Sequence, residues 1–372
     1  MGYFVRKEVL GLERYVAGKP ISEVKRELGL SEVIKLASNE NPLGCSPRAK
    51  KAMEETIEEV CLYPDASNYE LKNAIAEHLR VTPSQIFCGT GSDLLVRVIC
   101  NTLLSPGDES IMAEVTFSRY DAGTKLMGGK SIIIPMKNHG LDIEAMVAAI
   151  NEKTKIMWLC NPNNPTGTIF TKQELENVID RIPSTVTIIL DEAYIEYVTD
   201  KEYPDSLKLL EKYPNIIILR TFSKAYGLAG LRCGYGIAAE ELVEYFNTVT
   251  GPFDVNLIAQ KAAVAALKDK EYLKLVYETN VKGRDYLYSE FQELNLEYIK
   301  TNANFIMVST RFDDKFVFNE LLKRGIIIRP GHLLSMPGWM RVTIGTMEQN
   351  KAFIKALREI FKEASGEEKP AV

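Results

Sequence analysis

Residues 215–238 read NIIILRTFSKAYGLAGLRCGYGIA, two apolar runs joined by a turn that contains Lys224 and Arg232. The run at 215–220 is β-branched and of strand length, which predicts a buried strand, and a second strand is expected at 233–238. A lysine is usually a solvated surface charge. Its position directly after a buried strand therefore points to a chemical role at the end of a sheet.

Five further strand-like runs precede this stretch, separated by amphipathic segments of about 10 to 15 residues. Such alternation is typical of a parallel sheet covered by helices. Helix starts are marked by Ser92 beside an acid and by the capping box of Thr171 and Glu174. We expect an α/β fold with a large domain built on a seven-stranded, mostly parallel sheet, with strands at 86–88, 110–113, 131–136, 155–160, 186–190, 215–220 and 233–238.

The pattern changes after Gly251 and Pro252, where a long helical stretch at 256–294 leads into short strands and two more helices. This order predicts a smaller α+β domain. Its strands are expected at 297–300, 304–309, 326–329 and 340–344, and its helices at 313–324 and from 347. The expected division is an N-terminal arm (1–36), a large domain (37–252) whose first residues can pack with the small domain, and a small C-terminal domain (253–372).

Charge and composition exclude several classes of function. The 45 basic and 50 acidic side chains give a net charge of −5 with no basic cluster, so no nucleic-acid or membrane partner is expected. The apolar runs are shorter than the roughly 18 residues that span a bilayer, and the first residues lack a signal-peptide core. These features predict a cytoplasmic protein. Three scattered histidines and six cysteines without a C-x-x-C pair predict no metal site.

Ligands of an open α/β sheet bind beyond the carboxyl ends of its strands. The strand at 86–88 leads through Gly91 and Ser92 into a helix start, where N–H groups and the helix dipole can hold a phosphate. The dinucleotide fingerprint G-x-G-x-x-G is incomplete because Leu94 replaces its third glycine. This turn taken alone also fits an ordinary strand-to-helix connection.

Three more strand ends carry polar groups. The strand at 155–160 is followed by NPNNPTG (161–167), a rigid loop that can fix the amide of Asn164. Asp191 follows the strand at 186–190, and Tyr194 lies one turn further on. A carboxylate in this place is expected to be buried and to need a cationic partner. Lys224 closes the set.

The four strand ends together supply a phosphate cradle, an amide, a carboxylate, a phenol and an amine. Pyridoxal phosphate needs a lysine for its Schiff base, a carboxylate that keeps its ring nitrogen protonated, donors near its phenolic oxygen and a phosphate site. The combination therefore predicts pyridoxal 5′-phosphate as the cofactor.

The chain resembles the aspartate-aminotransferase superfamily of pyridoxal-phosphate enzymes (fold type I, class II), and within it the histidinol-phosphate aminotransferases. The similarity runs from LASNENPLG (36–44) to RVTIGT (341–346). It implies that Lys224 binds the cofactor covalently and that Asp191 pairs with the ring nitrogen, while Tyr194 and Asn164 bond the phenolic oxygen. The residues that the resemblance places around the cofactor phosphate are Gly91, Ser92, Asp93, Ser223 and Arg232.

The resemblance also places Phe117 on the cofactor ring, although this residue fits an ordinary core position as well. It brings Tyr63 to the phosphate of the neighbouring subunit's cofactor, which implies a homodimer with shared active sites; a turn aromatic before a proline is the other interpretation. Thr90 and Leu94 depart from the Asn and Glu that related sequences often carry. We expect the backbone cradle to survive both changes.

On the substrate side, the resemblance assigns the α-carboxylate to Arg341 and the rest of the substrate to Arg329, Tyr15 and Asn39. A guanidinium binds carboxylate or phosphate through two parallel hydrogen bonds. Arg329 could instead cap a strand in solvent. If Arg329 meets a phosphate, the reaction is transamination of L-histidinol phosphate with 2-oxoglutarate, a step of histidine biosynthesis that yields imidazole acetol phosphate and L-glutamate.

Three other activities remain open. The first is an aromatic (Phe or Tyr) or broad-range amino-acid aminotransferase, and the second is a threonine-phosphate decarboxylase. The third is a non-catalytic pyridoxal-phosphate protein of the kind fused to DNA-binding domains. Such a regulator would carry an additional N-terminal helix-turn-helix, and fewer than 40 residues precede Asn39.

Overall fold

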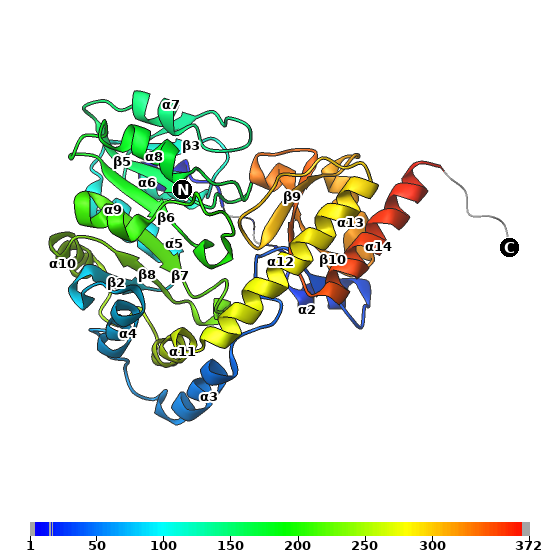
Figure 1. Ribbon diagram of the computed structural model, residues 1–372, viewed down its shortest axis with the longest axis horizontal. Helices are drawn as coiled ribbons and strands as arrows, with labels where there is room; N and C mark the ends of the chain where they lie inside the picture. Colours follow the sequence, from blue (N-terminus) through cyan, green and yellow to red (C-terminus); the bar gives the residue numbers. More distant parts are fainter. Residues whose placement is uncertain (1–3, 15, 17, 367–372) are drawn as a thin grey trace.

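The computed structural model describes residues 4–14, 16 and 18–366 and places them in a large and a small part (Figure 1). The large part contains a seven-stranded sheet in the order β2-β8-β7-β6-β5-β3-β4. Only β8 runs antiparallel to its neighbours. The predicted α/β fold and all seven of its strands are confirmed: β2 (Ile86–Gly89), β3 (Glu109–Ala113), β4 (Lys130–Ile134), β5 (Thr154–Cys160), β6 (Thr187–Asp191), β7 (Ile216–Thr221) and β8 (Gly234–Ile237).

The central strands are apolar throughout because helices cover both faces of the sheet. Ile188 and Ile218 point into one core and Ile189 and Ile217 into the other. Burial on both faces is the reason why these strands show continuous apolar runs rather than alternation. The helices on the first face are α3 (Pro47–Thr56), α4 (Tyr69–Leu79), α7 (Ile143–Ala148), α8 (Lys172–Ile179), α9 (Ser206–Lys212) and α11 (Leu257–Leu267), and those on the second are α5 (Ser92–Leu103), α6 (Arg119–Leu126) and α10 (Glu240–Val249).

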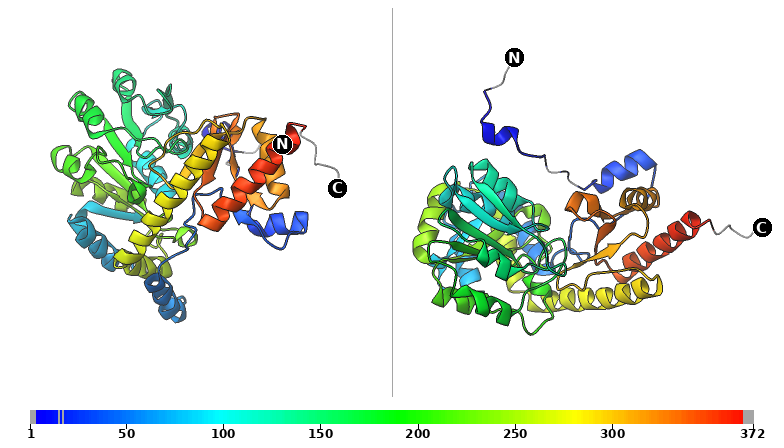
Figure 2. Two further views of the ribbon diagram at one scale, coloured as in Figure 1. Left: turned by 45° about the vertical axis from the view of Figure 1, so that its right-hand side comes forward. Right: turned by 90° about the horizontal axis from the view of Figure 1, so that it is seen from above.

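The small part is an antiparallel sheet in the order β11-β12-β9, covered by helices. The long helix α12 runs from the large part into the small one and lies beside α14 (Figures 1 and 2). Near the N-terminus, β1 pairs in parallel with β10, which ties the start of the chain to the small part. The elements are α1 (Lys7–Leu10), α2 (Ile21–Leu28), β1 (Ile34–Lys35), α12 (Lys270–Glu293), β9 (Phe305–Ser309), α13 (Asp314–Lys323), β10 (Ile326–Ile327), β11 (Arg329–Pro330), β12 (Trp339–Thr343) and α14 (Met347–Ala364).

Three sequence predictions for the small part were wrong in detail. The expected strand at 326–329 is two short strands, β10 and β11, which belong to different sheets. Residues 297–300 form no strand, because only an isolated bridge joins Tyr298 to Val308. The helical stretch at 256–294 is two helices, since the side chain of Asp269 accepts from Tyr272 N (3.3 Å) and starts α12. Short 3-10 helices complete the fold: η1 (Ile57–Glu59), η2 (Pro83–Gln85), η3 (Ile195–Tyr197), η4 (Ala229–Leu231) and η5 (Gly331–Leu334).

The predicted domain limits stay a proposal. Helix α11 contributes Ala259, Ala262 and Ala263 to the core of the large part, although it lies after the proposed boundary at 252/253. Its packing favours a boundary further along the chain, inside α12.

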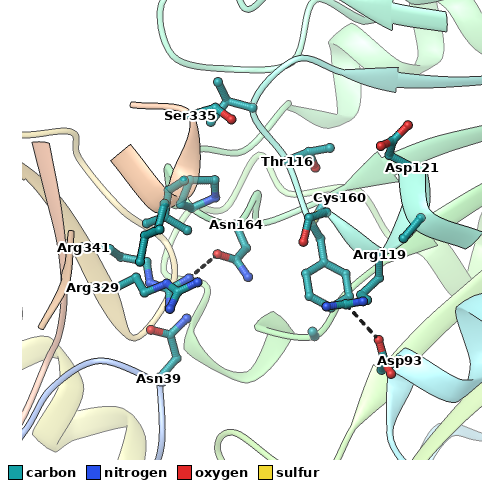
Figure 3. Close-up of a pocket in the computed structure, with 18 of the residues that line it drawn as sticks. Asn39, Asp93, Thr116, Arg119, Asp121, Cys160, Asn164, Arg329, Ser335 and Arg341 are labelled. Carbon is teal, nitrogen blue, oxygen red and sulfur yellow. Dashed lines mark hydrogen bonds and ion pairs between the residues drawn. The ribbon is translucent and has the colours of Figure 1, made fainter. Parts of the chain in front are cut away.

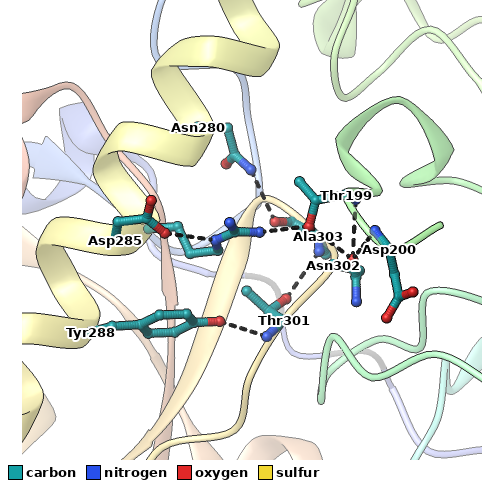
Figure 4. A network of polar contacts seen from close by, with 9 residues as sticks. Thr199, Asp200, Asn280, Asp285, Tyr288, Thr301, Asn302 and Ala303 are labelled. Atoms are coloured by element: carbon teal, nitrogen blue, oxygen red, sulfur yellow. Dashed lines mark hydrogen bonds and ion pairs between the residues drawn. The ribbon is translucent and has the colours of Figure 1, made fainter.

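A polar network fixes the junction of the two parts (Figure 4). The Oδ1 atom of Asn302, on the loop before β9, accepts from the backbone N atoms of Thr199 (3.1 Å) and Asp200 (3.3 Å). Arg284 of α12 donates to Thr199 Oγ1 (3.0 Å). The loop after β6 is therefore held against both α12 and the small sheet. No helix within the described residues has the length and apolar character needed to cross a membrane.

Candidate active site

A cavity of about 710 Å³ lies at the carboxyl ends of the strands, between the large and small parts (Figure 3). It contains almost all of the residues that the sequence predicted. Asn164 follows β5, Asp191 ends β6, and Arg341 lies on β12 of the small sheet. The predicted residues that line the cavity are Asn39, Ser92, Asp93, Phe117, Asn164, Asp191, Tyr194, Ser223, Lys224, Arg232, Arg329 and Arg341.

Three predicted residues are not among those that line it. Tyr15 is outside the described residues. Gly91 is the N-cap residue of α5 and directly precedes Ser92, which does line the cavity. Tyr63 is 82% exposed and stacks on Phe253 at 4.6 Å between ring centroids, away from the cavity of its own chain.

Lys224 follows β7 by three residues, and its Nζ atom donates to the carbonyl of Ser38 (3.2 Å). Burial, followed by the neighbouring charge of Arg341, lowers the pKa of Lys224 to about 8. The turn after it needs a glycine, because Gly227 has φ +70° and a Cβ there would lie 1.8 Å from the carbonyl oxygen of Gly44. The fold therefore presents an amine that readily becomes neutral.

Asp191 is almost fully buried at the end of β6. Burial raises its pKa to about 6, and a hydrogen bond from the Tyr120 hydroxyl to Oδ2 (2.6 Å) opposes that rise. Tyr120 is fixed in turn by stacking on Trp158, with 4.5 Å between ring centroids. Tyr120 was not predicted as a site residue, because it lies 71 residues before Asp191 in the chain.

The N-terminus of α5 forms the end of the cavity suited to a phosphate. Ser92, Ser223 and Arg232 meet there, and Arg232 Nη1 donates to Ser223 Oγ (3.3 Å). Gly91 has φ +79°, and a Cβ on it would lie 2.5 Å from Arg232 Nη2, so a side chain would displace the guanidinium. Asp93 is held by Arg119, whose Nε atom lies 3.4 Å from its Oδ1 (Figure 3).

Groups from both parts meet across the cavity. Arg341 donates through Nη1 to Asn164 Oδ1 (2.5 Å; Figure 3) and through Nη2 to the carbonyl of Ala37 (2.9 Å). Asn39 donates through Nδ2 to the hydroxyl oxygen of Tyr194 (2.9 Å). The predicted pair Asn164 and Tyr194 is therefore oriented by residues assigned to the substrate side.

Arg329 and Arg341 occupy paired positions on neighbouring antiparallel strands. Side chains at directly opposed positions lie on the same face of a sheet. Both residues are buried, at 5% and 7% exposure, and both line the cavity. Two positive charges therefore adjoin the place where the substrate is expected.

The arrangement fits pyridoxal phosphate. The donor set has a buried amine at Lys224, a buried carboxylate at Asp191 and a phosphate cradle that includes Arg232. The space that a Cβ would fill at Gly91 is already taken by Arg232, so the backbone and the guanidinium come close together at the cradle. Asn164 and Tyr194 line the same cavity and can supply the polar groups that a phenolic oxygen requires.

Other lining residues were not predicted. They include Thr116, Arg119, Cys160 and Ser335 (Figure 3), together with parts of the segment from Gly11 to Gly18. Most of them could not be predicted from the sequence, because their neighbours in the cavity are remote in the chain. His332 also lines the cavity, as its place close after Arg329 in the sequence suggested, although the sequence assigned it no role.

Comparison with known proteins defines the class. The sequence model of the family "Aminotransferase class I and II" matches residues 31–357 of this chain, and the chain belongs to this family. It is a pyridoxal-phosphate-dependent aminotransferase with the fold type I architecture.

Several proteins and structures similar to this chain are histidinol-phosphate aminotransferases. The chain is 50% identical to histidinol-phosphate aminotransferase of Caldicellulosiruptor saccharolyticus, over 96% of this chain and 99% of that protein. It is 49% identical to the protein of the same name from Moorella thermoacetica, over 96% and 92% of the two chains. A crystal structure of histidinol-phosphate aminotransferase from Sinorhizobium meliloti with pyridoxal 5′-phosphate has a TM-score of 0.89, 26% identity and coverage of 98% and 99%.

Proposed function

We propose that this chain transfers the amino group between L-histidinol phosphate and 2-oxoglutarate, forming imidazole acetol phosphate and L-glutamate, and that it serves histidine biosynthesis. The observation that carries the proposal is the pair Arg329 and Arg341, paired across two strands and facing one cavity. Adjacent guanidinium groups suit a phosphate dianion or a dicarboxylate. The two relatives at about half identity, both named histidinol-phosphate aminotransferase, support the same substrate.

The residue roles belong to this proposal. The cofactor, when bound, supplies an electron sink for the electron pair left behind when the α-proton departs. Lys224 would hold the cofactor covalently, and its Nζ atom, when free and neutral, would accept and return the α-proton. A pKa of about 8 makes the neutral base accessible near neutral pH. Asp191 keeps the ring nitrogen protonated, and Tyr120 helps Asp191 to stay ionised.

Positioning falls to the remaining residues. Phe117 would pack on the cofactor ring, and Asn164 and Tyr194 would hold its phenolic oxygen. Arg341, with Arg329 and Asn39, orients the substrate against Lys224. The residues that would hold the cofactor phosphate are Gly91, Ser92, Asp93, Ser223 and Arg232.

A homodimer is part of the proposal. Tyr63 and Phe253 form a stacked, exposed pair, and Ile57, Val60 and Leu62 are exposed nearby in the sequence. A second copy of the chain covering this apolar surface would bury it and would bring Tyr63 to the cofactor phosphate of its partner. Light scattering of the purified protein tests the dimer. We also propose that the protein is cytoplasmic, as the sequence predicts.

Steady-state kinetics test the substrate. We expect kcat/KM with histidinol phosphate and 2-oxoglutarate to exceed the values for Phe and Tyr. Arg329→Leu should lower kcat/KM for histidinol phosphate about 10- to 100-fold, because a hydrogen-bonded charge is lost. Arg324→Leu is the matched control, because Arg324, the C-cap residue of α13, pairs with Glu320 and Glu363 and does not line the cavity.

Two results would contradict the proposal. Equal or better use of unphosphorylated Phe and Tyr would favour an aromatic aminotransferase. Release of carbon dioxide without consumption of a keto acid would indicate a decarboxylase.

A further inference from the structure

His332 is held against a buried carboxylate at the wall of the cavity. Its Nδ1 atom lies 2.6 Å from Asp314 Oδ2, and its backbone N donates to the same oxygen (2.8 Å). The backbone N of Gly338 donates to Asp314 Oδ1 (3.3 Å). Asp314 is 3% exposed in the first turn of α13. Three contacts from one short segment therefore fix this carboxylate and the ring beside it.

The contact with Asp314 defines which ring atom remains for a ligand. Burial of Asp314 opposes its ionisation, but the hydrogen bonds from His332 and Gly338 hold its pKa below the usual value. An ionised carboxylate only accepts hydrogen bonds, so Nδ1 of His332 carries a proton and donates to it. Nε2 is the ring nitrogen left for another partner, and His332 lines the cavity.

Each of the elements α13, β11 and β12 packs against η5 and carries a charged residue. They contribute Asp314, Arg329 and Arg341 respectively. Arg329 precedes His332 by three residues and lines the same cavity. In the imidazolium form both ring nitrogens donate, and Asp314 offsets the added charge. The charges on these elements would therefore allow the His332 ring and Arg329 to contact the same anion.

We propose that His332, held by Asp314, is a further substrate-specificity residue, whose Nε2–H donates to the phosphate group that Arg329 binds. The inference rests on the proposed function, since it takes histidinol phosphate as the substrate. It assigns the Asp314–His332 pair a role in reading the phosphate, separate from the acid–base chemistry of Lys224.

Binding measurements on the cofactor-loaded enzyme test this role without relying on turnover. Each ligand is titrated while the absorbance of the bound cofactor is followed, for L-histidinol phosphate and for L-histidinol, which lacks the phosphate. In His332→Leu we expect the Kd of histidinol phosphate to rise about 10- to 100-fold and that of L-histidinol to change less than about 3-fold. His332→Gln, whose amide can donate, should recover part of the loss.

Two further variants sharpen the comparison. Asp314→Asn keeps an acceptor for the backbone N–H groups but removes the charge behind the ring, and it should weaken histidinol phosphate selectively and less than His332→Leu does. His78→Leu, an exposed histidine on α4, is the control and should leave both ligands unchanged. Thermal unfolding of every variant separates loss of binding from loss of fold.

Several outcomes would overturn the inference. Equal weakening of both ligands in His332→Leu would mean that the ring contacts another part of the substrate or acts only on the fold. Unchanged binding of histidinol phosphate would remove His332 from recognition altogether. If the wild-type enzyme itself does not turn over histidinol phosphate, the proposed function fails, whereas an active wild type with an unselective His332→Leu contradicts this inference alone.

Discussion

Replacing Tyr120 by Phe should make cofactor binding depend on pH. The hydroxyl of Tyr120 donates to Asp191 Oδ2 at 2.6 Å, and both residues are buried. Phe keeps the ring that stacks on Trp158, so the substitution removes the hydrogen bond and little else. Asp191 then loses its strongest support for the ionised form.

The size of the effect follows from the strength of the lost bond. A hydrogen bond to a charged group contributes about 1.5–3 kcal/mol, and one pKa unit corresponds to about 1.36 kcal/mol. The pKa of Asp191, about 6 in the cofactor-free protein, should therefore rise by roughly one to two units. An acid with a raised pKa is protonated over a wider range of low pH. Since only the carboxylate can pair with a protonated ring nitrogen, affinity for the cofactor should fall roughly 3- to 25-fold at pH 6.5 and less than about 1.5-fold at pH 8.5.

The assay is a titration of the cofactor-free protein with pyridoxal phosphate at pH 6.5, 7.5 and 8.5, followed by absorbance. The matched control is Tyr213→Phe, because Tyr213 also donates to a carboxylate at 2.6 Å, that of Asp180, but on the surface. This control should bind the cofactor like the wild type at each pH. A deficit in Tyr120→Phe that is the same at all three values would refute the reasoning, since the loss would then not act through the ionisation of Asp191.

Two further predictions concern Lys224 and the buried ion pair beside the site. With a pKa of about 8, the amine of Lys224 in the cofactor-free protein is about 9% neutral at pH 7 and about 91% neutral at pH 9. The rate of covalent cofactor attachment should therefore rise about 10-fold between these two pH values and then level off. A rate that continues to rise above pH 10 would contradict the lowered pKa of Lys224. Arg220 donates through Nε and Nη2 to Glu192 Oε2 (2.9 and 2.8 Å). Arg220→Leu should lower the free energy of unfolding in urea by about 3–5 kcal/mol, because it leaves the carboxylate of Glu192 buried without its cation. Adding Glu192→Leu should restore part of that loss.

The strands and the residues that follow them could be predicted because both depend on local sequence. A strand covered by helices on both faces must be apolar along its whole length, as Ile216, Ile217 and Ile218 show. The chemistry of an open sheet gathers where such strands end, which made Asp191 and Lys224 recognisable. Their placement in one cavity followed from strand direction alone.

Contacts between distant residues could not be predicted in the same way. Tyr120 and Asp191 are 71 residues apart, and the local sequence around either residue does not indicate that the two are in contact. The same holds for Asp314 and His332, which meet only because η5 packs against α13. At 297–300 a strand was predicted that the structure does not contain. Beyond the isolated bridge at Tyr298, these residues pair with no strand.

The site uses burial to bring its two titrating groups close to neutral pH from opposite sides. Burial penalises the charged form of any group, so it raises the pKa of Asp191 to about 6 and lowers that of Lys224 to about 8. A base poised near the working pH is the more efficient proton carrier, which suits Lys224. Asp191 instead has to remain ionised, and for that purpose it has Tyr120, and the ring cation when the cofactor is bound. One physical effect therefore serves the lysine and opposes the aspartate, and the hydrogen bond from Tyr120 is how the fold treats them differently.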